Sequence, residues 1–221
     1  MKLCSATNKG FMFNLSKSIK THGILVRELH TGHREKILTH LLELSDTDRT
    51  LRFGMYTSNE VIERYVAGID FLNDSVFGVF DSKLHLIGLA HLGYPLFGNQ
   101  TNKTAEFGVS VSQTGRGKGI GSALFKRAAM HARNTNIEIL YVHCLSSNKV
   151  MMHIAKKAGM DIEFSYGEAD AYLRLMPPDN ASIMSEAVQA QVADIDYAIK
   201  RNLKNSKNIF LNLWPFATST K

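Results

Sequence analysis

Cysteine and proline are scarce in this sequence, which has two cysteines and four prolines in 221 residues. Cys4 and Cys144 lie far apart and form no C-x-x-C pair, which excludes a disulfide framework and suits a reducing cytosol. Cys144 lies inside the apolar run L-Y-V-H-C-L, and this setting favours a small buried residue over a reactive thiol. The nine histidines show no metal-ligand spacing, so no metal site is expected.

Long apolar runs are also missing. The sequence has no stretch of about 18 apolar residues, so it predicts no membrane-spanning helix. The first residues, M-K-L-C-S-A-T-N-K-G-F-M-F, lack the apolar stretch of roughly 7–15 residues that a secretory signal peptide has. We therefore expect residues 1–23 to be a basic N-terminal extension and the protein to be cytoplasmic.

Acidic residues are absent from both ends of the chain, although the whole sequence carries a net charge of +6. Residues 1–27 and 200–221 together hold ten of the 26 basic residues, whereas all 20 acids lie between them. The middle of the chain has the other 16 basic residues and is therefore net acidic, at −4. Because nucleic-acid-binding domains have a basic folded face, this distribution disfavours nucleic acid as a partner.

The remaining composition, 44% hydrophobic and 21% charged, is that of a globular domain long enough to bury its own core. Alternation and helical spacing predict a mixed sheet flanked by helices. The expected strands are 24–29, 76–80, 84–92, 105–111, 139–145, 161–166 and 169–175. The expected helices are 33–44, one starting near Thr57 or Ser58 with Thr57 and Glu60 able to form a capping box, one ending near Asn134, and 148–158. Residues 44–53 are expected to be a turn-rich connection, and Asp81–Ser82 a tight hairpin turn.

Beyond Pro177–Pro178 the sequence predicts a separate C-terminal part, residues 177–221. Apolar residues at helical spacing form a single stripe on this part: Val188, Val192, Ile195, Ile199 and Leu203. The segment I-F-L-N-L-W-P-F at 209–216 is too apolar to remain in water. We expect this C-terminal helix and apolar tail either to dock on the chain's own domain or to form a homodimer interface, and the sequence leaves both open.

Four alternating glycines, Gly115, Gly117, Gly119 and Gly121, lie between a predicted strand and a predicted helix. Glycine allows close backbone approach to a ligand, and a helix start offers unpaired N–H groups and a partial positive charge. Residues 107–137 contain five basic residues and no acid. This combination predicts a binding site for a polyphosphate.

Two common phosphate-binding motifs do not fit this segment. The dinucleotide motif G-x-G-x-x-G has no third glycine in register, and the P-loop motif G-x-x-x-x-G-K-[ST] fails because Gly119 follows Lys118. The pattern that fits is R-x-x-G-x-G, formed by Arg116, Gly119 and Gly121.

With this pattern the sequence resembles the GNAT superfamily of N-acetyltransferases over residues 24–176. The most specific piece is E-F-G-V-S-V-S-Q-T-G-R-G-K-G-I-G-S-A-L at 106–124, and N-K-V-M-M-H-I-A-K-K-A-G-M at 148–160 matches the family's asparagine-led helix. The segment 44–53 looks most similar to the catalytic domain of bacterial protein-lysine acetyltransferases. The resemblance implies an α/β (α+β) fold, with a mixed, mostly antiparallel sheet of about seven strands that is splayed at an acyl-CoA site.

The resemblance also implies how acetyl-CoA, the expected co-substrate, would be held. Backbone groups of Val109 and Val111 would pair with the pantetheine arm as if it were an added strand, and Asn148 would hydrogen-bond the arm near its sulfur. Amides of the glycine loop would hold the pyrophosphate: Arg116, Gly117, Lys118, Gly119, Ile120, Gly121 and Ser122.

Acetyl transfer to an amine requires a base, because a lysine with a pKa of about 10.4 is protonated at neutral pH. Similar lysine acetyltransferases carry a glutamate at the position of Glu106, which is therefore our candidate base. A structural glutamate paired with a neighbouring basic residue is the alternative.

The group that protonates the leaving thiolate is missing from its usual place. Many family members have a tyrosine seven residues after the motif asparagine, and that position is Ala155 here. His143 is our candidate catalytic substitute, and Ser146, Tyr166 and Tyr172 are further candidates. A thiol pKa of about 8.5 also allows the thiolate to leave unassisted.

The expected function is the transfer of acetyl from acetyl-CoA to a primary amine, either a protein lysine or a small amine, by direct attack in a ternary complex. The alternative is a non-catalytic acyl-CoA-binding sensor with the same fold, which the alanine at the tyrosine position leaves open. Acids in or near residues 30–72 either recognise a cationic acceptor or are simply solvated: Glu43, Asp46, Asp48, Glu60, Glu63, Asp70 and Asp74.

Overall fold

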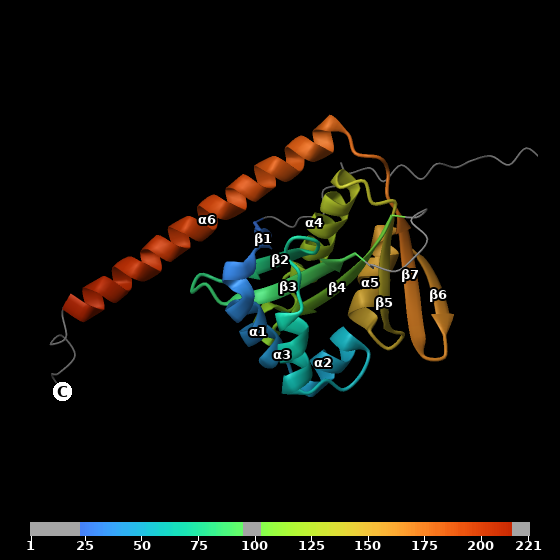
Figure 1. Ribbon diagram of the computed structural model, residues 1–221, viewed down its shortest axis with the longest axis horizontal. Coiled ribbons are helices and arrows are strands. Elements are labelled where there is room, and N and C mark those ends of the chain that lie inside the picture. Colours follow the sequence, from blue (N-terminus) through green and yellow to red (C-terminus); the bar gives the residue numbers. More distant parts are fainter. Residues whose placement is uncertain (1–22, 95–102, 214–221) are drawn as a thin grey trace, which may run out of the picture.

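A seven-stranded sheet forms the centre of the protein in the computed structural model, which describes residues 23–94 and 103–213 (Figure 1). The order of the strands across the sheet is β1-β2-β3-β4-β5-β7-β6. The strands are β1 (Arg27–Leu29), β2 (Ser75–Phe80), β3 (Leu86–Gly93), β4 (Thr104–Val111), β5 (Ile139–Leu145), β6 (Asp161–Ser165) and β7 (Glu168–Arg174). Neighbouring strands pair antiparallel, except that β4 and β5 are parallel. The expected mixed, mostly antiparallel sheet of seven strands is confirmed.

Helices cover both faces of this sheet, so that β2 is buried along its whole length. The helices are α1 (Arg34–Leu42), α2 (Asp46–Phe53), α3 (Asn59–Ala67), α4 (Ile120–Asn134), α5 (Lys149–Ala158) and α6 (Asn180–Leu213). One core cluster contains Val76 of β2 together with apolar residues of α1 and α3. The other contains Phe77 of β2, with residues of α4 and α5. Alternate residues of a strand thus fill two cores on opposite faces.

Residues 44–53, which we expected to be a turn-rich connection, mostly form the helix α2, and that prediction was wrong. Ser45 caps the helix by accepting a hydrogen bond from the backbone N–H of Asp48, and acids occupy the first turn. Gly54 ends it in the left-handed conformation, with φ 78°. The start and stop signals were present, but the helix is short and mostly polar and therefore shows little apolar periodicity.

The capping box predicted at the start of α3 was wrong. The N-cap of α3 is Ser58, whose hydroxyl donates to the Glu60 carboxylate at 2.6 Å, so no Thr57–Glu60 capping box forms.

The hairpin predicted at Asp81–Ser82 is confirmed. The strands β2 and β3 pair antiparallel, and the backbone N–H of Leu84 donates to the carbonyl of Asp81 in the connecting turn. The connection extends to His85, whose carbonyl accepts from the backbone N–H of Asp81, and the Asp81 carboxylate accepts two backbone N–H groups inside the loop.

The helix that follows β7, α6, has 34 residues and is about 50 Å long. It runs along α4 and β1 and continues past the edge of the sheet (Figure 1). In the part of the chain that the structure describes, no helix is long and apolar enough to span a bilayer. The division of the chain at residues 23 and 177 stays a prediction.

Candidate functional site

The strands β4 and β5 diverge soon after they begin to pair. Only three residues of β4, from Thr104 to Glu106, have partners on β5. The backbone N–H of Ser112 donates to the carbonyl of Ile87 on the opposite side, at 3.0 Å. Hydrogen bonds of an antiparallel pair alternate along the strand, so this bond directs the backbone groups of Val109 and Val111 away from β3 and toward the gap. The gap therefore offers unpaired strand backbone to an extended ligand.

The glycine loop leads from the end of β4 into α4 and presents backbone N–H groups at the helix start. Gly117 and Gly119 have φ angles of 72° and 81°, which side-chain-bearing residues rarely adopt. Gly119 is the N-cap and supplies no side-chain cap, and the first turn contains no acid. The N–H groups of Ile120, Gly121 and Ser122 therefore lack helical partners, as at any helix start. This end of α4 is suited to an anion.

The two basic side chains of this loop contact the protein itself. Arg116 forms an ion pair with Asp48 of α2, and Lys118 donates to the carbonyl of Thr114 at 2.6 Å. Arg116 thereby joins the glycine loop to α2, the helix that begins after Ser45. An anion at the loop would compete with Asp48 for this guanidinium.

Asn148 also connects the region of the strand gap to α2. Its side-chain oxygen caps α5 by accepting from the backbone N–H of Met151 at 3.0 Å. Its side-chain nitrogen donates to the carbonyl of Leu51 in α2, at 3.4 Å. The side-chain amide is half-buried, and its two ends hold α5 and α2 together.

Glu106 lies on the opposite face of β4 from Phe107, as expected, and it lines a pocket of about 270 Å³. The other lining residues are Arg52, Tyr65, Asp74, His91, Gly93, Tyr94 and Gly108. The Glu106 side chain is exposed and forms no hydrogen bond or ion pair with a described residue. A carboxylate that no described residue pairs with, inside a pocket and beside the strand gap, is suitably placed to accept a proton.

Four side chains of this pocket form a polar chain that sequence reasoning missed. Arg52 of α2 donates to the hydroxyl of Tyr65 at 2.9 Å, and that hydroxyl lies 2.6 Å from Nδ1 of His91. When the hydroxyl hydrogen points to Nδ1, the imidazole proton lies on Nε2 and faces Asp74. The Nε2 atom lies 3.2 Å from the carboxylate of Asp74, off hydrogen-bond geometry, and is buried with no other partner in the described chain. Burial lowers the pKa of His91 and raises that of Tyr65, so both are neutral.

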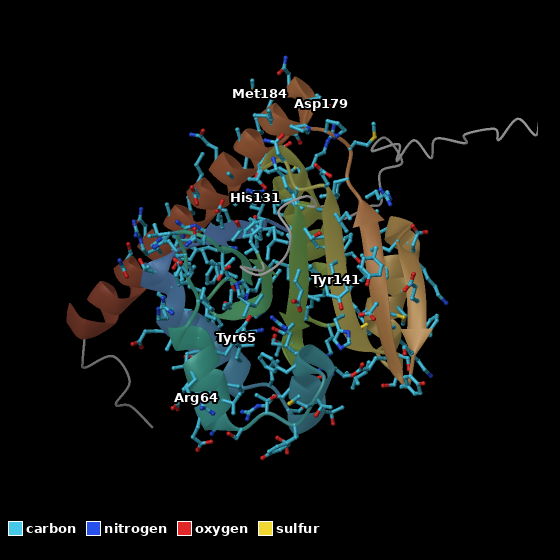
Figure 2. All side chains as sticks on the ribbon, turned by 45° about the vertical axis from the view of Figure 1, so that its right-hand side comes forward. Arg64, Tyr65, His131, Tyr141, Asp179 and Met184 are labelled. Atoms are coloured by element: carbon cyan, nitrogen blue, oxygen red, sulfur yellow. The ribbon has the colours of Figure 1, made fainter. Side chains whose placement is uncertain are left out.

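A second polar cluster lies on β5 and β7, beyond Glu106 in the sheet. The hydroxyl of Tyr141 donates to Asp170 at 2.6 Å, and Nδ1 of His143 lies 2.8 Å from the same carboxylate oxygen. The hydrogen bond to Asp170 raises the pKa of His143. Glu106 is in register with Tyr141 across the parallel pair, and Figure 2 shows Tyr65 and Tyr141 on either side of β4. The two polar clusters thus flank Glu106.

A comparison with protein families decides the identity of this fold. The model of the acetyltransferase (GNAT) family matches residues 39–160, more than half of the chain and all of the strand gap and glycine loop. The chain belongs to the GNAT family of acetyltransferases. It is accordingly an N-acetyltransferase, and the resemblance inferred from the glycine loop is confirmed. No curated protein sequence matches the chain.

Solved GNAT structures superpose on most of this chain. The GNAT domain of PAT from S. lividans has a TM-score of 0.58 at 20% identity, covering 68% of this chain and 89% of that one. The spermidine N-acetyltransferase of Vibrio cholerae, in complex with CoA and spermine, has a TM-score of 0.53 at 23% identity and covers 68% and 95%. The ribosomal-protein-alanine N-acetyltransferase of Brucella melitensis has a TM-score of 0.53 at 14% identity and covers 69% and 100%. At these identities the likeness establishes the fold alone.

As a GNAT protein, this chain departs from the family pattern at Ala155, which is completely buried between α5 and the sheet. Among the candidate substitutes for the missing tyrosine, Ser146 donates to the carbonyl of Gly167, and Tyr166 is fully exposed in the β6–β7 turn. Tyr172 lies with its ring centre 5.2 Å from that of Tyr141. Of these groups, His143 is the one paired with a carboxylate. In the described residues no cluster of three potential metal ligands occurs.

Proposed function

We propose that this protein transfers acetyl from acetyl-CoA to a primary alkylamine, with Glu106 as the base. The single observation that carries this proposal is the position of Glu106, whose free carboxylate lines a pocket where β4 and β5 separate. An alkylammonium entering the pocket must lose a proton before its nitrogen can attack. Glu106 accepts that proton directly or through one water.

The strand gap and the glycine loop fit acetyl-CoA as co-substrate, which supplies the acetyl group as an activated thioester. Val109 and Val111 would hold its pantetheine arm through their backbone, with the Asn148 amide near the sulfur end. The amides from Arg116 to Ser122 would hold the pyrophosphate. This assignment rests on the unpaired amides, the two left-handed glycines and the acid-free first turn of α4.

His143 is our candidate for the group that donates a proton to the departing sulfur. Its raised pKa favours the imidazolium form, and Asp170 fixes the ring through Nδ1. Nε2 lies 3.7 Å from Glu168, a longer contact that leaves this nitrogen available as a donor. The buried Ala155 offers no donor of its own.

We expect the acceptor to be a cation, because the carboxylates of Glu106 and Asp74 line the pocket. The rings of Tyr65 and Tyr94 also line it, which favours a narrow alkyl chain. A lysine side chain and a polyamine both end in such an alkylammonium. The GNAT domain of PAT and the spermine complex are therefore useful guides to the panel of acceptors, which should include protein lysines and polyamines.

The test is thiol release from acetyl-CoA in the presence of that panel, for the wild type and for Glu106→Gln. We expect Glu106→Gln to lower kcat by about 10²–10⁴-fold with CoA affinity unchanged. Glu138→Gln is the matched control, because Glu138 is exposed at the start of β5, outside the pocket. An unchanged rate for Glu106→Gln would remove Glu106 as the base.

The alternative function, an acyl-CoA-binding sensor, is supported by one observation, the alanine at the position of the family's tyrosine. A sensor would bind acetyl-CoA and release no thiol with any amine. Binding measured by calorimetry alongside thiol release separates the two functions, because only the enzyme shows both.

A further inference from the structure

The long helix α6 is fixed to the domain by one of its faces. The carboxylate of Glu186 accepts from Arg127 at 2.5 Å and from Asn134 at 2.6 Å, and it lies 2.7 Å from Nδ1 of His131. One turn after the buried Ala193, the ring of Tyr197 packs on Phe80, with Arg27 stacked over it. These contacts define which side of α6 faces α4 and β1, and the described side chains on the opposite side are exposed.

The uncovered side carries a continuous apolar surface. Six side chains at helical spacing are between 44% and 66% exposed, and we refer to them as the α6 stripe: Met184, Val188, Val192, Ile195, Ile199 and Leu203. They lie about 150° around the helix from the docked face, at 100° per residue. Met184 lies on the side of α6 away from the sheet in Figure 2. Apolar surface of this extent marks an interaction site.

We propose that the α6 stripe pairs with the α6 stripe of a second copy of this chain, with the two helices antiparallel. In this orientation each stripe residue meets another at the same level along the axis. Met184 lies opposite Leu203, Val188 opposite Ile199, and Val192 opposite Ile195, since the spacing of the stripe reads the same from either end. A surface that is complementary to itself under a two-fold rotation is what a symmetric dimer requires.

The helix dipoles favour this orientation over a parallel one, because antiparallel helices oppose them. The acids of α6 are engaged within the same chain: Glu186 pairs with Arg127, Asp194 with Arg27, and Asp196 with Lys200. All three acids lie nearer the docked face of α6 than the stripe does, so the stripe presents apolar side chains to the second copy.

The shape of the helix surface beside the stripe also suits a neighbouring helix. Small side chains lie beside the stripe next to Ile195: Ala187, Ala190 and Ala198. Small side chains allow a second helix to approach closely and insert its larger residues.

The first test is the molar mass of the full chain in solution, by light scattering and sedimentation over a range of concentrations. We expect a dimer, and we expect Ile195→Glu with Ile199→Glu to reduce the mass to that of one chain, 24.7 kDa. The matched control is Ile183→Glu with Gln189→Glu, which adds the same two charges at exposed positions of α6 outside the stripe and outside the neighbouring alanines. A wild type that is monomeric at every concentration would overturn the proposal. So would a dimer that survives the stripe substitutions while the variant keeps the helical circular dichroism of the wild type.

The second test distinguishes the two orientations by disulfide cross-linking in a Cys4→Ser background. A chain with Met184→Cys is mixed with a differently sized, tagged chain with Leu203→Cys. Antiparallel pairing predicts the mixed product, because residue 184 of one copy lies opposite residue 203 of the other. The two residues at position 184 would lie about 28 Å apart along the helix axis, too far to form a disulfide. A majority of self-paired products would show parallel helices and overturn the proposal. Monomeric protein that binds anionic lipid vesicles through the stripe would also overturn it, by assigning the stripe to a membrane surface.

Discussion

The glycine loop from Ser112 to Ser122 and the pocket around Glu106 use different parts of the chain for their chemistry. The loop offers backbone N–H groups at the start of α4, while its two basic side chains contact Asp48 and the Thr114 carbonyl. The pocket offers side chains, which come from α2, α3, β3, β4 and the segment before β2. We therefore expect CoA affinity to depend on the backbone conformation of the loop. Turnover of the amine should depend on the side chains of the pocket and on pH.

The largest effect should come from a change in loop shape, Gly119→Val. A β-branched residue at a φ of 81° costs about 1–3 kcal/mol, which alters the conformation on which the amides depend. We expect CoA affinity, measured by calorimetry, to fall about 100-fold. Gly93→Ala is the control, because a methyl group there meets no atom within 4 Å. Unchanged CoA affinity in Gly119→Val would contradict a backbone-based site.

The corresponding change in the pocket is Gly108→Ala, with a smaller expected effect. A Cβ atom at Gly108 would lie 2.4 Å from Cζ of Arg52, so the guanidinium must move away from Tyr65. We expect kcat/KM for the amine to fall about tenfold, or about 1.4 kcal/mol, with CoA affinity unchanged. If CoA affinity fell as much as kcat/KM for the amine, the pocket would also contribute to CoA binding, which contradicts this division between loop and pocket.

The polar cluster on β5 and β7, beside the pocket, should respond to charge, and Asp170→Asn tests this. The hydrogen bond to Asp170 raises the pKa of His143, so its loss should return that pKa toward 6.5. An NMR titration of the His143 imidazole measures the shift, with Glu163→Gln as a control at a nearby exposed acid. We expect activity to decline at lower pH in Asp170→Asn than in the wild type, because the imidazolium is lost earlier as pH rises. The same decline in both proteins would remove His143 as the proton donor.

The smallest effect should come from a side chain of the loop, Arg116→Ala. The guanidinium is about half exposed and already paired with Asp48. A surface charge of this kind contributes about 1 kcal/mol or less, so CoA affinity should fall no more than about fivefold. A loss as large as that of Gly119→Val would show that the side chain, and not the backbone, holds the phosphates.

The two regions also differ in how well the sequence predicts them. The loop is contiguous, so its glycines, its acid-free flank and its position between strand and helix could be read directly. Glu106 was chosen because similar lysine acetyltransferases carry a glutamate at this position, on the strand that leads into the loop. Arg52, Tyr65, Asp74 and His91 meet only through sheet register and helix packing, which alternation in one sequence does not specify. Arg52 was further hidden because α2 is short and mostly polar, although Ser45 and Gly54 mark its ends.

The helix α2 is shared by both regions. Asp48 holds the loop arginine, the carbonyl of Leu51 accepts from Asn148, and Arg52 reaches into the pocket. A ligand that draws Arg116 away from Asp48 releases one support of the helix that positions Arg52. We therefore expect occupancy of the loop to change the affinity of the pocket for the amine, and thermodynamic reciprocity makes the factor equal in both directions. Asp48→Asn should weaken this coupling between the two substrates while each substrate still binds alone.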